Sequence, residues 1–375
     1  MMVQNWQVLN VDRKERELAG GAKLGRGFWE DTSRLYKSLR IPCLPKAVDK
    51  WLSRGTFMLQ WGRMGMISAE VLDMIFKAIL DDVKEDPAYN FIDCLHLAVC
   101  CKQLLFVGKR HILRTLIFLH ARAADCRLVC LGEYAGADDQ APPGMLTDAE
   151  HKEIATMKVP HEEDNFGSDE EDKAAKVIAA RCLYSFASEL YEPCASVADL
   201  LQKPLRHLCR KNHNARKREG YMIEPLYALD MDMVTALGCI DYWPRPTYPE
   251  GPAVLCNTSK GEYVLGDTLV VLQNQRCRVT LAHALLARIC YSPDSSISVA
   301  CDAEYAGQLA KGPWAGDKFR ITTVNELPVL KDGKEWKDVT EEANKLLCHL
   351  WEREMSGVED GSDTEAGSGE DSEAE

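Results

Sequence analysis

Residues 66–76 read Met-Ile-Ser-Ala-Glu-Val-Leu-Asp-Met-Ile-Phe, and residues 95–102 read Leu-His-Leu-Ala-Val-Cys-Cys-Lys. In the first stretch apolar residues recur every four positions from Ile67 to Ile79, which gives a helix one broad apolar side and one charged side. Ser68 is suited to cap that helix, because its hydroxyl can accept a hydrogen bond from an orphan backbone N–H. The stretch therefore predicts an amphipathic helix that begins at Ser68.

Two further helices are expected after it. The polar segment 81–90 contains Pro87, which has no N–H to donate and should end the first helix. A second helix should begin near Asn90, and a third run of apolar residues continues the pattern after Gly108. About fifty residues make a marginal core, so some apolar surface must pack on the rest of the chain or on a partner.

This stretch resembles an F-box. The matching positions are Glu70, Ile75, Phe76, Leu95, Val99, Cys100 and Lys102, while Ile67 stands where the pattern has leucine and Ser68 where it has proline. The resemblance implies a helical module that binds the adaptor subunit of a cullin-RING ubiquitin ligase, through an interface formed by these seven residues and Ile67. A generic three-helix core is the alternative, because apolar helical periodicity alone is common.

The resemblance extends more loosely to three other segments. Residues 6–15, 261–264 and 314–319 are similar to short sequence motifs found in uncharacterised F-box-like families of mushroom-forming (basidiomycete) fungi. Those families imply no established target.

Length and composition bound the class of protein. The chain has 375 residues, 46% of them hydrophobic and 27% charged, which suits an ordinary globular protein with two compact units. No apolar run is long enough to span a bilayer, and the first fourteen residues lack the apolar core of a secretory signal. We expect a cytoplasmic or nuclear protein.

The fifteen cysteines are scattered singly, so buried reduced thiols are expected. Cys126 and Cys130 have metal-like spacing without a second pair, and we expect neither a metal nor a cofactor. No phosphate-binding or dinucleotide-binding glycine motif and no serine-nucleophile elbow occurs, so we expect no catalytic residue and no enzyme.

Composition divides the chain as follows: an N-terminal strand and helix segment at 1–62 that could pair with the C-terminal domain, the F-box-like module at 63–121, a mobile acidic insertion or linker at 137–172, an α+β target-binding region at 173–355, and a disordered acidic tail at 356–375. Within the α+β region a helix is expected from residue 173, another over 197–209, a hairpin over 253–265, short strands at 297–300 and 319–323, and helices over 280–290 and 339–355. The expected fold class is α+β with short antiparallel strands.

Short words repeat within the chain. Residues 8–16 align with 255–263 through an Asn, a basic residue and a Glu, and residues 124–128 faintly match 316–319. If the repeat is real, the N-terminal strand pairs with C-terminal strands and the helical module is an insertion in a larger domain.

Two other segments carry more than one interpretation. The basic cluster 206–218 could bind phosphate, an acidic peptide or the acidic tail, or be a solvated helix end; nucleic-acid binding is disfavoured by the net charge of −13. The proline-rich segment 243–249 could be a recognition loop or a structural brace.

The sequence thus favours a non-catalytic, substrate-recruiting receptor that binds a ligase adaptor and an unknown target protein, with no membrane partner. A stand-alone interaction protein is the second hypothesis. An unrecognised hydrolase or transferase is the third.

Overall fold

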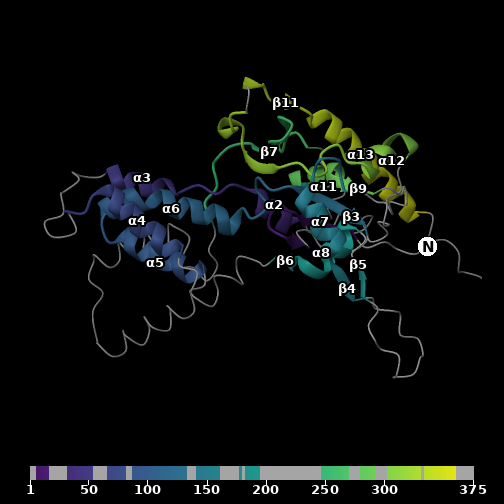
Figure 1. The fold of residues 1–375 in the computed structure, drawn as a ribbon. Helices are drawn as coiled ribbons and strands as arrows, with labels where there is room; N and C mark the ends of the chain where they lie inside the picture. The colour runs from purple at the N-terminus through teal and green to yellow at the C-terminus, as the bar shows by residue number, and fades with distance from the viewer. Residues whose placement is uncertain are drawn as a thin grey trace, which may run out of the picture. The chain divides into compact units, whose positions relative to one another are not determined.

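The computed structural model describes residues 6–16, 32–53, 66–81, 87–132, 141–160, 177–179, 182–194, 246–269, 279–292, 302–330 and 333–359 (Figure 1). These residues form a mixed α+β fold, as the sequence predicts. The chain divides into two compact units: unit 1 comprises 1–36, 125–194 and 252–375, and unit 2 comprises 37–124 and 195–251.

Unit 2 is a helical bundle (Figure 1). Its helices are α3 (Lys46–Ser53), α4 (Ala69–Leu80), α5 (Pro87–Val99) and α6 (Lys102–His120). The prediction for the start of α4 is confirmed, because Ser68 is its N-cap and accepts a hydrogen bond from the N–H of Val71 at 3.4 Å. Apolar side chains of all four helices share one core, so α3 belongs with the module although the sequence placed it in a separate segment.

Two expected helix boundaries differ from the structure. Helix α4 already ends at Leu80, and Pro87 occupies the first position of α5, where its missing N–H costs nothing. Gly108 does not separate two helices, because α6 runs through it without a break. A Cβ at Gly108 would lie 2.6 Å from Cζ of Phe76, so the glycine allows α6 to approach the ring of Phe76 on α4.

Unit 1 contains two main sheets. The five-stranded sheet has the order β6-β2-β1-β3-β9, and the four-stranded sheet has the order β10-β7-β8-β11. The strands are β1 (Trp6–Asn10), β2 (Glu15–Arg16), β3 (Leu128–Gly132), β6 (Glu192–Pro193), β7 (Ala253–Asn257), β8 (Glu262–Leu265), β9 (Cys290–Tyr291), β10 (Phe319–Thr323) and β11 (Lys337–Asp338), with β4 (Lys158–Pro160) and β5 (Val177–Ala179) forming a separate pair.

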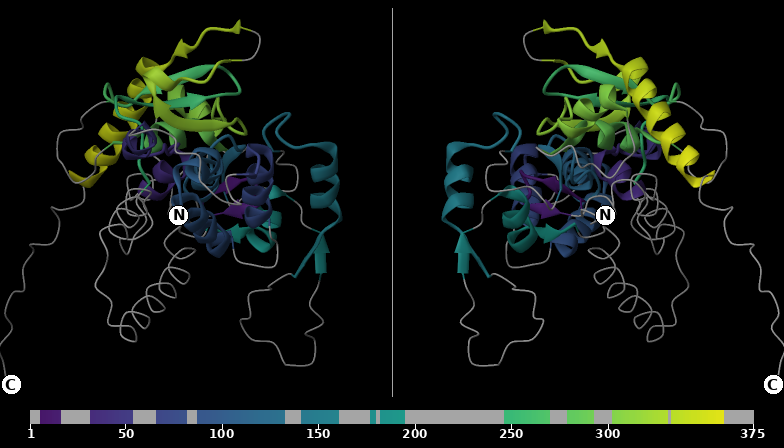
Figure 2. Two further views of the ribbon diagram at one scale, coloured as in Figure 1. Left: turned by 90° about the vertical axis from the view of Figure 1, so that its left-hand side faces the viewer. Right: turned by 90° about the vertical axis from the view of Figure 1, so that its right-hand side faces the viewer.

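Helices cover these sheets. They are α7 (Asp148–Thr156), α8 (Leu183–Leu190), α11 (Leu281–Ile289), α12 (Ala303–Ala310) and α13 (Thr340–Glu359), with a 3-10 turn η2 (Val324–Glu326), while α2 (Ser33–Leu39) crosses from unit 1 to unit 2. Every residue of α11 is buried. Helix α13 runs beside the β7–β8 hairpin (Figure 2), where the Thr340 hydroxyl accepts a hydrogen bond from the N–H of Leu265 at 3.0 Å.

Several local predictions are confirmed in this unit: the hairpin β7–β8, strand β10, helix α11 and helix α13. The helix expected from residue 173 is wrong in its first part, since β5 precedes α8 there. Residues 356–359 belong to α13 and not to a disordered tail.

The expected linker at 137–172 also contains ordered structure. Helix α7 begins with a capping box, in which the Thr147 hydroxyl and the Glu150 carboxylate each bind the other's backbone N–H. Its Ile154 is buried in a core with Leu9, Val129 and Phe186. This part of the segment is therefore a packed helix of unit 1.

Strand β1 pairs with β2 and β3, and β9 from the C-terminal part joins the same sheet beside β3. In the segment 246–250, Thr247 forms a β-bridge with Cys43, and the Arg40 guanidinium lies 4.1 Å from the Tyr248 ring centroid. These contacts suit a structural brace. The helix expected over 197–209, the basic cluster 206–218, the strand at 297–300 and tail residues 360–375 lie outside the described residues.

Candidate docking surface

The predicted interface residues divide between the core of the helical module and its surface. Phe76, Leu95 and Val99 are at most 9% exposed and lie in the core of unit 2. Ile67 and Ile75 are partly buried against that core. These five side chains hold the three helices together, so the first three cannot contact a partner without unfolding the module.

The polar members of the predicted interface lie nearer to solvent. Glu70 is exposed, and its hydrogen bond with Ser68 lowers the pKa of its carboxyl group. Cys100 is exposed and its thiol donates to the carbonyl of His96 at 3.1 Å. The Lys102 ammonium lies 5.8 Å from the Trp51 ring centroid, a cation–π contact that ties the start of α6 to α3.

The outer face of α4 carries large apolar side chains. Met66, just before the helix, is 86% exposed, Met74 is 68% exposed and Val71 is 46% exposed, whereas Leu72 and Phe76 on the opposite side of α4 are buried. Val71 and Met74 are three residues apart and share one helix face. We call Met66, Val71 and Met74 the α4 patch. The interface predicted from the sequence contains none of these three residues, although helical spacing relates Met74 to Val71.

Polar contacts fix the side of α4 that faces α6. The Asp73 carboxylate contacts both Arg110 and His111 of α6, and the His111 ring stacks on Phe76 with centroids 5.8 Å apart. Both basic partners lower the pKa of Asp73, Arg110 most strongly. Because this anchor and the Phe76–Gly108 contact fix the rotation of α4, the α4 patch must point away from the core.

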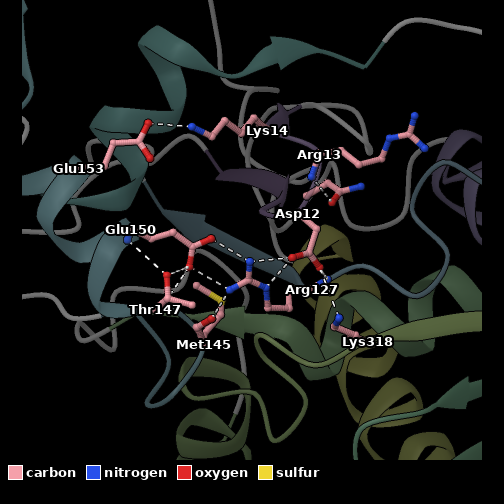
Figure 3. Close-up of polar contacts among 10 residues, drawn as sticks. Asp12, Arg13, Lys14, Arg127, Met145, Thr147, Glu150, Glu153 and Lys318 are labelled. Atoms are coloured by element: carbon pink, nitrogen blue, oxygen red, sulfur yellow. Dashed lines mark hydrogen bonds and ion pairs between the residues drawn. The ribbon is translucent and has the colours of Figure 1, made fainter. Parts of the chain in front are cut away.

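A second polar cluster lies in unit 1, where Arg127 is held between two carboxylates (Figure 3). Its guanidinium donates to Asp12 Oδ1 at 2.8 Å and to Glu150 Oε1 at 2.8 Å, and it also donates to the carbonyl of Met145. The hydrogen bond with Arg127 is the main cause that lowers the pKa of Glu150 to about 2. This cluster ties α7 to the β1–β2 turn.

Two histidines of the described residues, His120 and His283, are buried. Burial lowers the pKa of His283 to about 4, and its Nδ1 accepts a hydrogen bond from the N–H of Thr280 at 3.0 Å. Burial likewise lowers the pKa of His120 to about 4. Both rings are neutral at pH 7. Nδ1 of His283 also lies 3.0 Å from Oγ1 of Thr280 and 3.4 Å from Oγ1 of Thr32, so this ring joins the start of α11 to the residue before α2.

Across the described part of the chain, no three or more His, Cys, Asp or Glu side chains gather as metal ligands would. None of the described helices is both long and apolar enough to span a bilayer. The described cysteines are free thiols, six of them buried: Cys94, Cys130, Cys182, Cys194, Cys256 and Cys290.

Comparisons with known proteins place no relative beside this chain. No protein family, no curated protein and no solved structure matches it.

Proposed function

We propose that this protein is a non-catalytic receptor that recruits a target protein to a cullin-RING ubiquitin ligase, with the helices of unit 2 bound to the adaptor subunit of that ligase. The observation that carries the proposal is the α4 patch. It lies on the helix whose sequence resembles the start of an F-box, and it leaves Val71 and Met74 exposed while the opposite face is packed.

The chemistry of the patch suits protein recognition. Methionine side chains are flexible and polarizable, so they adapt to an apolar partner surface. Burying two such side chains on binding contributes about 1.5–3 kcal/mol each when the burial is complete. Glu70 borders the patch and would orient the partner through charge.

The protein would act by positioning its target protein and would not catalyse a reaction itself. Binding the adaptor at unit 2 and a target elsewhere would hold a target lysine near ubiquitin carried by another subunit, which raises its effective concentration. A ligase of this class works in the cytoplasm or nucleus, where we expect this protein.

The test is a binding assay between the full chain and a purified ligase adaptor. The variant Val71→Asp/Met74→Asp should weaken binding at least thirtyfold, because two carboxylates would be desolvated in the interface. The matched control is Val329→Asp in unit 1, where the side chain is 97% exposed. Phe76→Asp is not suitable here, because a buried charge would unfold the module.

Circular dichroism should show the same helix content in the double variant as in the parent chain. If the parent chain does not bind the adaptor, or if the double variant binds as tightly as the control, the receptor proposal is wrong. The second hypothesis, a stand-alone interaction protein, predicts that the native chain purifies with a partner but without adaptor or cullin. A hydrolase or transferase is the least supported candidate.

A further inference from the structure

We propose that unit 1 is built from two copies of one structural repeat, and that the helical module is an insertion in the first copy. Each copy consists of a hairpin, a helix, a third strand and a short fourth strand. Copy 1 is β1, β2, α2, β3 and β6; copy 2 is β7, β8, α11, β10 and β11. This inference is independent of the proposed function.

The two copies arrange their strands in the same way. In copy 1 the order is β6-β2-β1-β3, and in copy 2 it is β11-β8-β7-β10. The hairpin strands are antiparallel in both copies, the third strand is antiparallel to the first, and the short fourth strand is parallel to the second. Four strands with one order and one set of directions therefore occur twice.

The register of the pairs also agrees. Asn10 pairs with Glu15 across the first hairpin, and Asn257 pairs with Glu262 across the second. These are the Asn and Glu that align between the repeated sequence segments 8–16 and 255–263. Asn10 also pairs with Leu128 in the third strand of copy 1, as Asn257 pairs with Phe319 in copy 2.

The hairpin turns share a residue of positive φ and an asparagine hydrogen bond. Each turn ends in a residue of positive φ, Lys14 at 52° in copy 1 and Gly261 at 73° in copy 2. A positive φ is costly for lysine, so its presence at the matching position is a specific feature of the turn. In each turn the asparagine Oδ1 accepts from the N–H three residues on, Arg13 at 3.2 Å and Lys260 at 3.0 Å.

The fourth strands are held by matching hydrogen bonds. In copy 1, Glu192 N–H donates to the carbonyl of Lys14 at 3.0 Å. In copy 2, Lys337 N–H donates to the carbonyl of Gly261 at 2.8 Å. The next bond repeats as well, from Cys194 to Arg16 at 2.9 Å and from Val339 to Tyr263 at 3.0 Å.

The two copies meet through a reciprocal contact. The N–H of Asp125 donates to the carbonyl of Phe319 at 2.7 Å, and the N–H of Gly316 donates to the carbonyl of Leu128 at 2.8 Å. Asp125 and Gly316 each lie three residues before the third strand, with φ of 58° and 83°. Exchanging the copies exchanges the two bonds, which is the property of a two-fold arrangement.

Matching side-chain contacts also occur within each copy, just before its third strand. The N–H of Arg127 donates to Asp12 Oδ2 at 2.7 Å, and the N–H of Lys318 donates to Ser259 Oγ at 2.9 Å. Thr32 precedes α2 and Thr280 precedes α11, and their Oγ1 atoms lie 3.1 Å apart, within hydrogen-bond distance.

The copies differ in what joins the helix to the third strand. In copy 2 the described residues of this connection form the two-residue strand β9 and the short helix α12, whereas in copy 1 they form α3, α4, α5 and α6. The chain leaves and re-enters at neighbouring points, because Ala123 N–H donates to the carbonyl of Ser38 at 2.9 Å. The module therefore interrupts no strand pair of copy 1.

One test concerns the repeat and uses the full chain. Asn10→Ala and Asn257→Ala each remove the turn acceptor, so amide exchange at Arg13 and at Lys260 should each accelerate about tenfold, as loss of one hydrogen bond predicts. Asn325→Ala, at an exposed asparagine of η2, is the control and should change neither rate. If only one of the two turns responds, the turns are not equivalent and the repeat is refuted.

A second test concerns the insertion. Phe76→Asp in the full chain should abolish amide protection in α4, α5 and α6 but leave β1, β3, β7 and β10 protected, because no described strand pair passes through the module. Leu255→Asp, which places a charge in the copy 2 sheet, should give the opposite pattern. If Phe76→Asp removes the protection of the sheets as well, the module is not an insertion.

Discussion

Glu150→Gln should destabilise unit 1 in a manner that depends on pH. In the folded protein the pKa of Glu150 falls from 4.5 to about 2, chiefly through its hydrogen bond with Arg127. The difference of roughly 2.5 units corresponds to about 3 kcal/mol at pH 7. Because the two side chains are 27% and 18% exposed, solvent reduces this figure, and we expect a loss of about 1–3 kcal/mol.

The direction of this pH dependence follows from the lowered pKa of Glu150. A carboxyl group whose pKa is lowered by folding contributes its full stabilisation above the unfolded pKa of 4.5 and loses it as the pH falls toward 2. At pH 3 the contribution should be about two-fifths of its value at pH 7. Glutamine can still serve in the capping box, so the substitution removes the charge and retains the cap.

The assay is urea unfolding at pH 7 and at pH 3, followed through amide exchange of β1 and β3 so that unit 1 is observed separately. The control is Asp148→Asn, since Asp148 lies in the same first turn of α7 but is exposed. The variant should lose much more stability than the control at pH 7, and the difference should shrink at pH 3. Equal losses in the two variants, or a loss that does not change with pH, would refute the role of the Arg127 pair.

Two further predictions concern buried positions. Gly108→Val should destabilise unit 2 by about 2–3 kcal/mol in a thermal melt, because the new Cβ would overlap the Phe76 ring. The control is Gly307→Val on α12, which should be nearly neutral because no atom lies within 4 Å of its Cβ position. Burial raises the pKa of Cys94 to about 12, so about one Cys94 thiol in ten thousand is ionised at pH 8. A disulfide reagent should therefore label the exposed Cys100 long before Cys94, which mass spectrometry of the labelled protein would show. Equal labelling of the two thiols would contradict the packing around Cys94.

Local features of the fold could be predicted because their signals lie within a few residues. The Ser68 cap, the hairpin of β7 and β8, and helices α11 and α13 depend on capping chemistry, turn glycine and hydrophobic period, all of which are read along the chain. The Thr147 capping box was also present in the sequence, yet the acidic composition around it favoured a linker. Its packing depends on Arg127, which no local pattern indicates.

The candidate site was predicted only in part. The stripe on α4 is visible in the sequence, but spacing alone cannot say which members face the core. Leu72 and Phe76 are buried because Gly108 admits the Phe76 ring and Asp73 binds Arg110 and His111 on the neighbouring helix. The same contacts leave Met74 exposed.

By itself, the sequence determined that the chain is α+β, that a helix begins at Ser68, and that the segments 8–16 and 255–263 share an Asn and a Glu. Only the tertiary structure decided that these segments form hairpins in two sheets that share the order of four strands, that α6 passes through Gly108, and that Val71 and Met74 remain exposed. The reason is physical. Helix caps and turns depend on atoms a few residues apart, whereas strand partners and buried faces depend on contacts between residues distant in the chain.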